Sequence, residues 1–259
     1  LQVDREELGA IFKNASLLIR ALLANVVLVP AFAVLLVRVF HLKDPIAIGL
    51  LLMAICPGVP FVVLGGGVKK GGSLGFAVAL AFILPAVSVL TVPLTARLLL
   101  SGETAVATEN IVISLVLFQL LPLLVGMLVK ARLPAIAARL VKPVGLVCVA
   151  VILVVLVALA KIWFTSVTAV YGSLGILAML TLVILSLLTG WILGGPDRSH
   201  RRTLGVGTAL RNPGLAALIA TTNFSGIAEA AVMTYLLVQF VAVMIFGITY
   251  KPAAGDPQS

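Results

Sequence analysis

Apolar runs of about 20 residues recur along this chain, and they constrain its fold more than any other feature. A run of that length, as a helix, crosses the roughly 30 Å hydrocarbon core of a bilayer. Eight such runs lie near residues 17–40, 45–66, 73–100, 110–129, 144–164, 172–194, 203–222 and 228–249. Because a lipid-exposed backbone must satisfy its own hydrogen bonds, we expect helices. The sequence therefore predicts an all-α polytopic membrane protein.

The composition supports this prediction and excludes one obvious alternative. The chain is 62% hydrophobic and only 10% charged, with a mean hydropathy of +1.25, well outside the range of soluble proteins. Its net charge of +9 would suggest nucleic-acid binding in a soluble protein. Here the basic residues lie between apolar runs, so no basic domain face forms. Cys56 and Cys148 both lie inside apolar runs, which favours neither a disulfide nor a zinc site.

The connecting segments predict an orientation, because Lys and Arg are retained on the cytoplasmic side. With eight spans, 13 basic residues fall on one side: Arg5, Lys13, Arg20, Lys69, Lys70, Lys130, Arg132, Arg139, Lys142, Arg198, Arg201, Arg202 and Lys251. Four fall on the other: Arg38, Lys43, Arg97 and Lys161. Both visible termini are therefore expected in the cytoplasm, at a plasma or inner membrane.

Two connecting features accompany the spans. The segment 130–142, KARLPAIAARLVK, has apolar residues on one helical face and basic residues on the other. It predicts either a short interfacial helix or a plain basic connector. Residues 251–259 form a polar tail.

Two spans share a Pro-Gly pair near their middle: ICPGVP at 55–60 and RNPGLA at 211–216. Pro removes a backbone donor and Gly permits unwound geometry, so both helices are expected to break, at Cys56, Pro57 and Gly58 and at Pro213 and Gly214. The two spans run in opposite directions in the predicted topology. Interrupted spans in inverted repeats indicate the binding site of a secondary transporter. The alternative is that Pro-Gly merely kinks two packed helices.

If the span 203–222 is the fourth helix of a five-helix repeat, the span 45–66 should be the fourth of an equivalent repeat. Only three helices of that repeat are visible. We therefore expect two further helices before Leu1, in line with the absence of an initiator Met.

At this point the chain resembles the bile acid:sodium symporter family, as that family's third to tenth helices. The resemblance rests on LANVVLVPAFA at 23–33, CPG at 56–58, VKKGG at 68–72, TVPLT at 91–95, LPLLVGMLV at 121–129 and RNPGLA at 211–216. It implies a ten-helix fold in which two broken helices cross. It also implies core helices of the first repeat in 1–100, panel helices in 110–164 and core helices of the second repeat in 172–250.

The sequence departs from the family at the residues on which its sodium sites rest. Val62 and Val63 stand where the family has Ser-Asn, Gly207 where it has Glu, and Arg211 where it has Gln. Asn25 replaces a third-helix Gln. Sodium needs a shell of oxygen ligands. Na⁺ is thus implied by the resemblance, while most of its ligand positions are lost, and no other cofactor is expected.

Arg211 is the most unusual of these residues, because an arginine at the bilayer centre costs about 2.5 to 3.5 kcal/mol and is normally paired with an acid. No Asp or Glu lies in its span. One interpretation is that carbonyls freed at the two breaks satisfy it. Our hypothesis is that its charge also replaces sodium, leaving half-helix N-termini to attract an anionic substrate.

Four further residues complete the candidate substrate or ion site. Asn212 is expected to cap the second half of its span, or to bond across to the other break. Asn25 can bond the unwound part of the 203–222 span or act as interhelical glue. Thr208 and Gly207 lie one turn before Arg211, and Gln119 is a weaker candidate of the same kind.

These observations predict a secondary transporter of a small organic anion, working by alternating access without sodium. An intramembrane enzyme is not expected, because His41 and His200 lie in loops and no Asp lies within a span. An arsenite-type exporter would carry a thiol and an acid at the breaks, and here only Cys56 is present. The alternative from another class is a non-transporting membrane sensor or scaffold that retains the fold. Lipid is an expected partner, nucleic acid is not, and the oligomeric state is left open.

Overall fold

The computed structural model describes residues 9, 14–58, 71–100, 108–147, 150, 154, 174–224 and 226–249. In this part of the chain the secondary structure is helical, as predicted. The elements are α2 (Ala15–Leu22), η1 (Leu23–Leu28), α3 (Val29–Val39), α4 (Asp44–Ile55), α6 (Leu74–Leu99), α7 (Thr108–Leu115), η3 (Val116–Leu120), α8 (Leu121–Arg132), α10 (Gly175–Leu193), α11 (Arg198–Ala209), α12 (Pro213–Asn223) and α13 (Gly226–Thr249). Val62, Val63, Cys148, most of the predicted span 144–164 and the tail 251–259 lie outside the described residues.

Four helices in the described residues are long and apolar enough to cross a membrane. They are Ala15–Val39, Leu74–Leu99, Gly175–Leu193 and Gly226–Thr249. Each coincides with a predicted span. The run Thr108–Arg132 is also helical throughout and covers the predicted span 110–129.

Both Pro-Gly pairs lie at helix ends. The helix α4 stops at Ile55, and Cys56 has extended backbone. The predicted span 203–222 is two helices, because α11 stops at Ala209, Leu210 and Asn212 are extended, and α12 begins at Pro213. Pro213 occupies the first turn, where its missing N–H leaves no bond unmade. The span 203–222 is thus broken where the sequence predicts, and α4 ends at the predicted position, whereas residues 59–66 of the span 45–66 lie outside the described residues.

Two helices contain a π-helical turn just before a proline. The turn η1 precedes Pro30 and the turn η3 precedes Pro122. Proline cannot donate to the carbonyl four residues earlier, so the backbone there is free to widen to a longer hydrogen-bond spacing. Each turn carries one amide side chain, Asn25 in η1 and Gln119 in η3.

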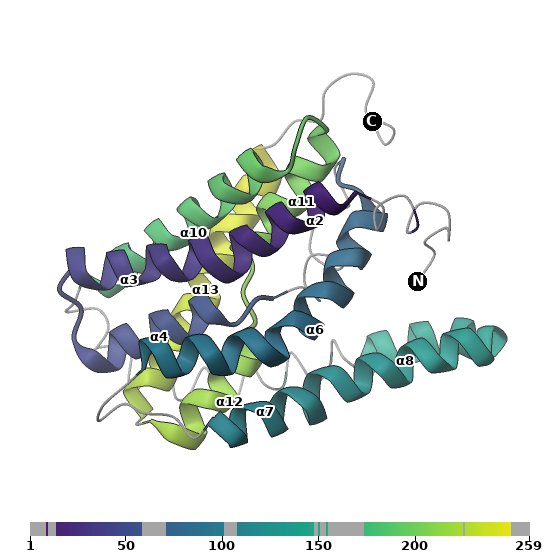
Figure 1. Cartoon of the computed structure of the whole chain (residues 1–259), viewed down its shortest axis with the longest axis horizontal. Helices are drawn as coiled ribbons and strands as arrows, with labels where there is room; N and C mark the ends of the chain where they lie inside the picture. Colours follow the sequence, from purple (N-terminus) through teal and green to yellow (C-terminus); the bar gives the residue numbers. More distant parts are fainter. Residues whose placement is uncertain are drawn as a thin grey trace.

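Small residues bring the central helices into close contact. A Cβ added at Gly49 of α4 would overlap Ala231 of α13, and one added at Gly190 of α10 would overlap Leu204 and Gly205 of α11. The α2–α3 helix packs beside α10, and α12 packs on α13 (Figure 1). These contacts enclose the two helix ends that carry the Pro-Gly pairs.

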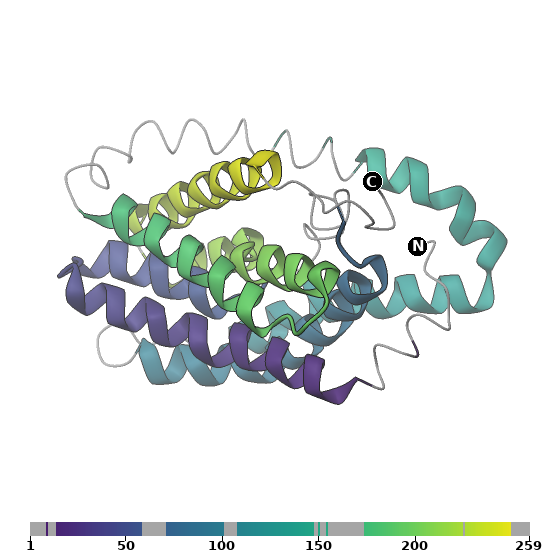
Figure 2. The same cartoon turned by 90° about the horizontal axis from the view of Figure 1, so that it is seen from above.

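The helices α7 and α8 continue into a second helix at residues 134–147, with a single non-helical residue, Leu133, between them. α7 packs on α6, and from α8 onward the hairpin extends away from the other helices in both views (Figures 1 and 2). The segment 134–147 is helical, as one interpretation of the sequence predicts, and runs past the expected start of the next span at 144. Its position at a membrane surface stays a prediction.

Candidate functional site

The two helix ends meet as a short pair of extended segments. The Asn212 backbone N–H donates to the Cys56 carbonyl at 3.0 Å, and Pro57 and Arg211 form an antiparallel bridge. The segments touch so closely that a Cβ at Gly58 would overlap the Arg211 carbonyl group. Gly58 is therefore required by this contact. We call the paired segments Cys56–Gly58 and Leu210–Asn212 the crossing.

The Arg211 side chain is fully buried at the crossing. Its Nε donates to the Met53 carbonyl at 3.2 Å, and an Nη2 hydrogen donates to the Ala54 carbonyl. Both carbonyls belong to the last turn of α4, where the helical hydrogen bonds run out, and the Met53 carbonyl also accepts from the Cys56 N–H at 3.3 Å. The guanidinium thus places its charge at the negative end of the α4 dipole. The predicted satisfaction of Arg211 by freed carbonyls is confirmed at α4.

Asn25 supplies the other acceptors for the guanidinium. Its Oδ1 accepts from Arg211 Nη1 at 2.9 Å, and its main-chain oxygen accepts from Nη2 at 3.2 Å. Its Nδ2 donates to the Ala21 carbonyl at 3.0 Å and to Thr208 Oγ1 at 3.4 Å. Asn25 therefore joins the α2–α3 helix to α11 and to the crossing, as the sequence predicted. Gly207 is buried in the last turns of α11, next to Thr208.

Gln239 of α13 also holds Arg211, and the sequence analysis missed it. Gln239 Oε1 accepts from the Arg211 backbone N–H at 2.8 Å, and Nε2 donates to the Arg211 carbonyl at 3.4 Å. The Gln239 side-chain amide thus pairs with both the N–H and the C=O of Arg211, as the backbone of a neighbouring β-strand would. The signal that points to Gln239 in the sequence is an amide residue in the middle of a largely apolar span.

Tyr235 lies one turn before Gln239, on the same face of α13. It is fully buried and within electrostatic range of Arg211. Its hydroxyl has no hydrogen-bond partner among the described residues.

Asn212 links the crossing to the hairpin. Its Oδ1 accepts from the Leu215 N–H at 3.1 Å and so caps α12, as predicted. Its Nδ2 donates to Gln119 Oε1 at 3.3 Å, and Gln119 Nε2 donates to Ser88 Oγ at 2.6 Å. Asn212 is half-buried and Gly214 is exposed, so this side of the crossing is more accessible than Arg211.

The crossing does not fit a sodium ion at the position of the guanidinium. The oxygens that could coordinate a cation there, from Met53, Ala54 and Asn25, already accept hydrogen bonds from Arg211. A sodium ion would have to displace a fixed positive charge.

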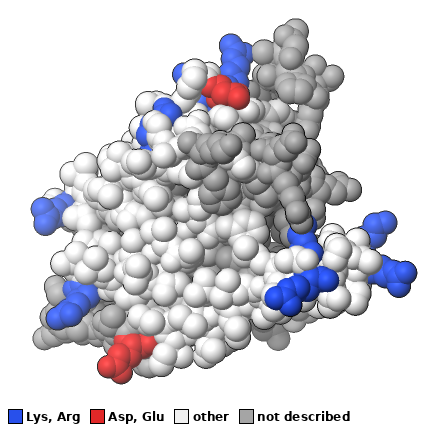
Figure 3. Space-filling view, turned by 45° about the vertical axis from the view of Figure 1, so that its right-hand side comes forward, with Lys and Arg blue, Asp and Glu red and all other residues white. Residues whose placement is uncertain are grey.

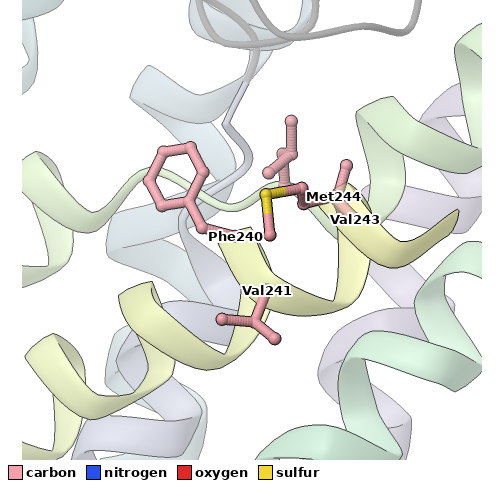
Figure 4. A pocket seen from close by; sticks show the side chains of 5 residues that line it. Phe240, Val241, Val243 and Met244 are labelled. Carbon is pink, nitrogen blue, oxygen red and sulfur yellow. The ribbon is translucent and has the colours of Figure 1, made fainter. Parts of the chain in front are cut away.

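A pocket of about 320 Å³ lies beside the crossing. It is lined by Leu210, Phe240, Val241, Val243 and Met244 (Figure 4). Leu210 directly precedes Arg211, and Phe240 directly follows Gln239, so an apolar surface adjoins the polar cluster. Such a surface can accept the apolar part of a solute.

Comparison with known proteins identifies the family. Residues 1–169 match the family described as Sodium Bile acid symporter family. The resemblance inferred from the residues is confirmed over this range, whereas RNPGLA at 211–216 lies outside it. The match and the long apolar helices make the chain an integral membrane protein of a transporter family.

Two curated relatives match more distantly. The human (Homo sapiens) "P3 protein" is 27% identical over 152 residues, covering 55% of this chain and 31% of that protein. The cattle (Bos taurus) "P3 protein" is 28% identical over 142 residues, covering 51% of this chain and 28% of that protein. The chain thus spans about a third of the length of the curated relatives that it matches.

Proposed function

Because the chain belongs to the sodium bile acid symporter family, we propose that it is a secondary transporter that moves a small organic anion by alternating access. Membership of this family supports a role in the transport of a solute. In this proposal the core helices lie in 1–100 and 172–250, and the panel helices in 110–164. The two termini lie in the cytoplasm. The rocking of core against panel is part of the proposal.

The proposal that transport does not need sodium rests on the hydrogen bonds of Arg211. Its buried guanidinium donates to oxygens of Met53, Ala54 and Asn25, where a sodium ion would need the same oxygens. A permanently charged side chain at this place makes sodium unnecessary for holding the crossing together. Transport by this chain is therefore independent of sodium.

In this proposal the anionic substrate binds on the more accessible side of the crossing, next to Asn212. Arg211 is fully buried, so it acts on an anion through its charge and by holding the crossing. Asn212 is half-buried and stands at the N-terminus of α12, where backbone N–H groups favour negative charge. The pocket beside Leu210 offers room for the apolar part of the same solute.

An uptake experiment tests this function. The full chain is reconstituted in proteoliposomes and offered radiolabelled anions of three types, a bile acid, a keto acid and a dicarboxylate. Uptake above that of protein-free liposomes is expected for at least one anion, with equal rates in sodium and in choline. Absence of uptake for every anion, or uptake in sodium alone, would contradict the proposal.

A matched pair of asparagines at the two ends of α12 tests the role of Asn212. Asn212→Ala should raise the apparent KM for the anion about tenfold or more, because a hydrogen bond to a charged group contributes about 1.5 to 3 kcal/mol. Asn223 ends α12, and among the described residues its side chain bonds the Ile219 carbonyl and Thr222. Asn223→Ala should leave KM within about twofold. Equal effects of both variants would remove Asn212 from the substrate site.

A second function has one observation in its favour. The Arg211 bonds join the α2–α3 helix, α4 and α13 to the segment that follows α11, which favours a rigid bundle. A non-transporting sensor or scaffold would use such a bundle to bind an anion without moving it. Saturable binding of an anion by purified protein that shows no uptake of it would support this alternative.

A further inference from the structure

The hairpin of α8 and residues 134–147 carries a basic cluster that the proposed transport does not use. Its members, which we call the hairpin tip, are Lys130, Arg132, Arg139 and Lys142, and all four are exposed. The sequence has no Asp or Glu between Glu109 and Asp197, so this charge has no acidic neighbour along the chain. Figure 3 shows Lys and Arg projecting together at the right-hand edge of the surface, with no Asp or Glu beside them.

The length of the helical run carries the tip out of the hydrocarbon. From Thr108 to Arg132 the helix is about 37 Å long at 1.5 Å per residue, whereas the hydrocarbon core is about 30 Å thick. Glu109 lies at the start of this run and the cations at its end. With the acidic end at one surface, Lys130 and Arg132 therefore lie at the depth of the opposite headgroups.

The returning helix is amphipathic at the same level. Ile136, Leu140 and Val144 recur at helical spacing and are 47%, 45% and 53% exposed. Lys142 lies on the opposite face and Arg139 flanks the stripe. Among the described helices, α8 packs extensively only against η3, which directly precedes it in the chain. An exposed apolar stripe beside exposed cations is the pattern of a segment seated between acyl chains and phosphates.

From these observations we infer that the hairpin tip binds anionic phospholipid headgroups. The apolar stripe enters the acyl boundary, and the four cations contact headgroup phosphates. Charge complementarity selects the occupant, because a zwitterionic headgroup would satisfy the stripe but bring no net negative charge to balance the cations. Anionic lipids are concentrated in the cytoplasmic leaflet, the side to which the basic residues assign this tip. The inference does not depend on the proposed transport.

A lipid titration of the full chain tests the inference. The purified protein in a neutral detergent is titrated with phosphatidylglycerol or with phosphatidylcholine, and the midpoint of thermal unfolding is followed. Phosphatidylglycerol should raise the midpoint at lower concentrations than phosphatidylcholine. Each cation near an anionic surface contributes about fivefold in affinity. The triple variant Arg132→Gln, Arg139→Gln, Lys142→Gln should therefore need on the order of 100-fold more phosphatidylglycerol for the same rise.

A control variant removes charge elsewhere. Arg38→Gln with Arg97→Gln takes two exposed cations from the opposite predicted side. It should leave the half-effective phosphatidylglycerol concentration within twofold. The inference is overturned if the two lipids act alike, or if the triple variant titrates like the parent chain. It is also overturned if the control shifts as far as the triple variant, or if glycerol phosphate alone reproduces the full rise.

Discussion

The two Pro-Gly breaks look alike in sequence and differ in what they contribute. The first, at the end of α4 and Cys56–Gly58, offers hydrogen-bond acceptors, which are the carbonyls of Met53, Ala54 and Cys56. It also leaves space for the other segment, because Gly58 has no side chain. The second, from Leu210 to Gly214, offers donors: the Arg211 guanidinium and the Asn212 N–H.

This difference teaches that two Pro-Gly breaks with similar sequences can be complementary in chemistry. An α-helix that ends inside a protein leaves unpaired carbonyls, and a helix that begins there leaves unpaired N–H groups. The α4 end is satisfied by a side chain from the other break, while the α12 start is satisfied by its own Asn212. The following predictions test that contrast, in order of decreasing effect.

The two glycines should differ most. Gly58→Ala places a Cβ against the Arg211 carbonyl, so the free energy of unfolding should fall by about 3 kcal/mol or more. Gly214→Ala meets only Asn212 Oδ1 at 3.5 Å, an ordinary contact, and should change it by less than about 1 kcal/mol. Thermal unfolding of the two variants measures the difference, and equal midpoints would refute the close contact at Gly58.

Removing the donor should destabilise the first break. Arg211→Met leaves the Ala54 carbonyl and Asn25 Oδ1 without this donor, at about 1 to 3 kcal/mol for each unsatisfied group, while the Met53 carbonyl keeps the Cys56 N–H. Loss of a buried charge offsets part of this, so we expect a net loss of about 2 to 3 kcal/mol. Arg211→Lys should recover less than half, since an ammonium cannot reproduce the guanidinium fork. Full recovery with Lys would mean that charge alone matters.

Substitution of Gln239 should lower the free energy of unfolding slightly less than substitution of Arg211. Gln239→Leu leaves the buried Arg211 N–H and carbonyl without their side-chain partner, and should lower stability by about 2 kcal/mol. Gln119→Leu removes an amide of the same size that is only half-buried, and should lower stability by about 1 kcal/mol. Chemical denaturation of both variants ranks them, and the reverse order would remove Gln239 from the crossing.

The smallest effect lies outside both breaks, at the start of α11. Partial burial raises the pKa of the Asp197 carboxyl, but hydrogen bonds from Ser199 and the charge of His200 outweigh it and leave the pKa lowered. A carboxyl with a lowered pKa stabilises the fold above its unfolded pKa, near 3.8, and this contribution is lost as pH falls through the lowered value. Asp197→Ala should therefore cost about 1 kcal/mol at pH 7 and progressively less below pH 4. Thermal midpoints of both chains across this range check the prediction.

The sequence predicted much of this arrangement because Pro, Gly and hydropathy act locally. Pro57 and Pro213 each mark a helix end, and the sequence predicts hydrogen bonds near the breaks from Asn25 and Asn212. Gln239 was missed because its role depends on which face of α13 meets α11, and a single polar residue in an apolar span does not reveal that. Likewise, the π-helical turn that carries Gln119 depends on hydrogen bonding near Pro122 that no periodicity shows.

The most direct test of the central claim is the sodium dependence of anion binding. The thermal midpoint of the purified chain is measured with and without an anion that gives uptake, in sodium chloride and in choline chloride. At 100 times its dissociation constant the anion should stabilise the protein by about 2.7 kcal/mol. Our account predicts the same rise in both salts for the parent chain and a smaller rise for Arg211→Gln. A rise in sodium alone would contradict the account, because Arg211 would then not replace the ion.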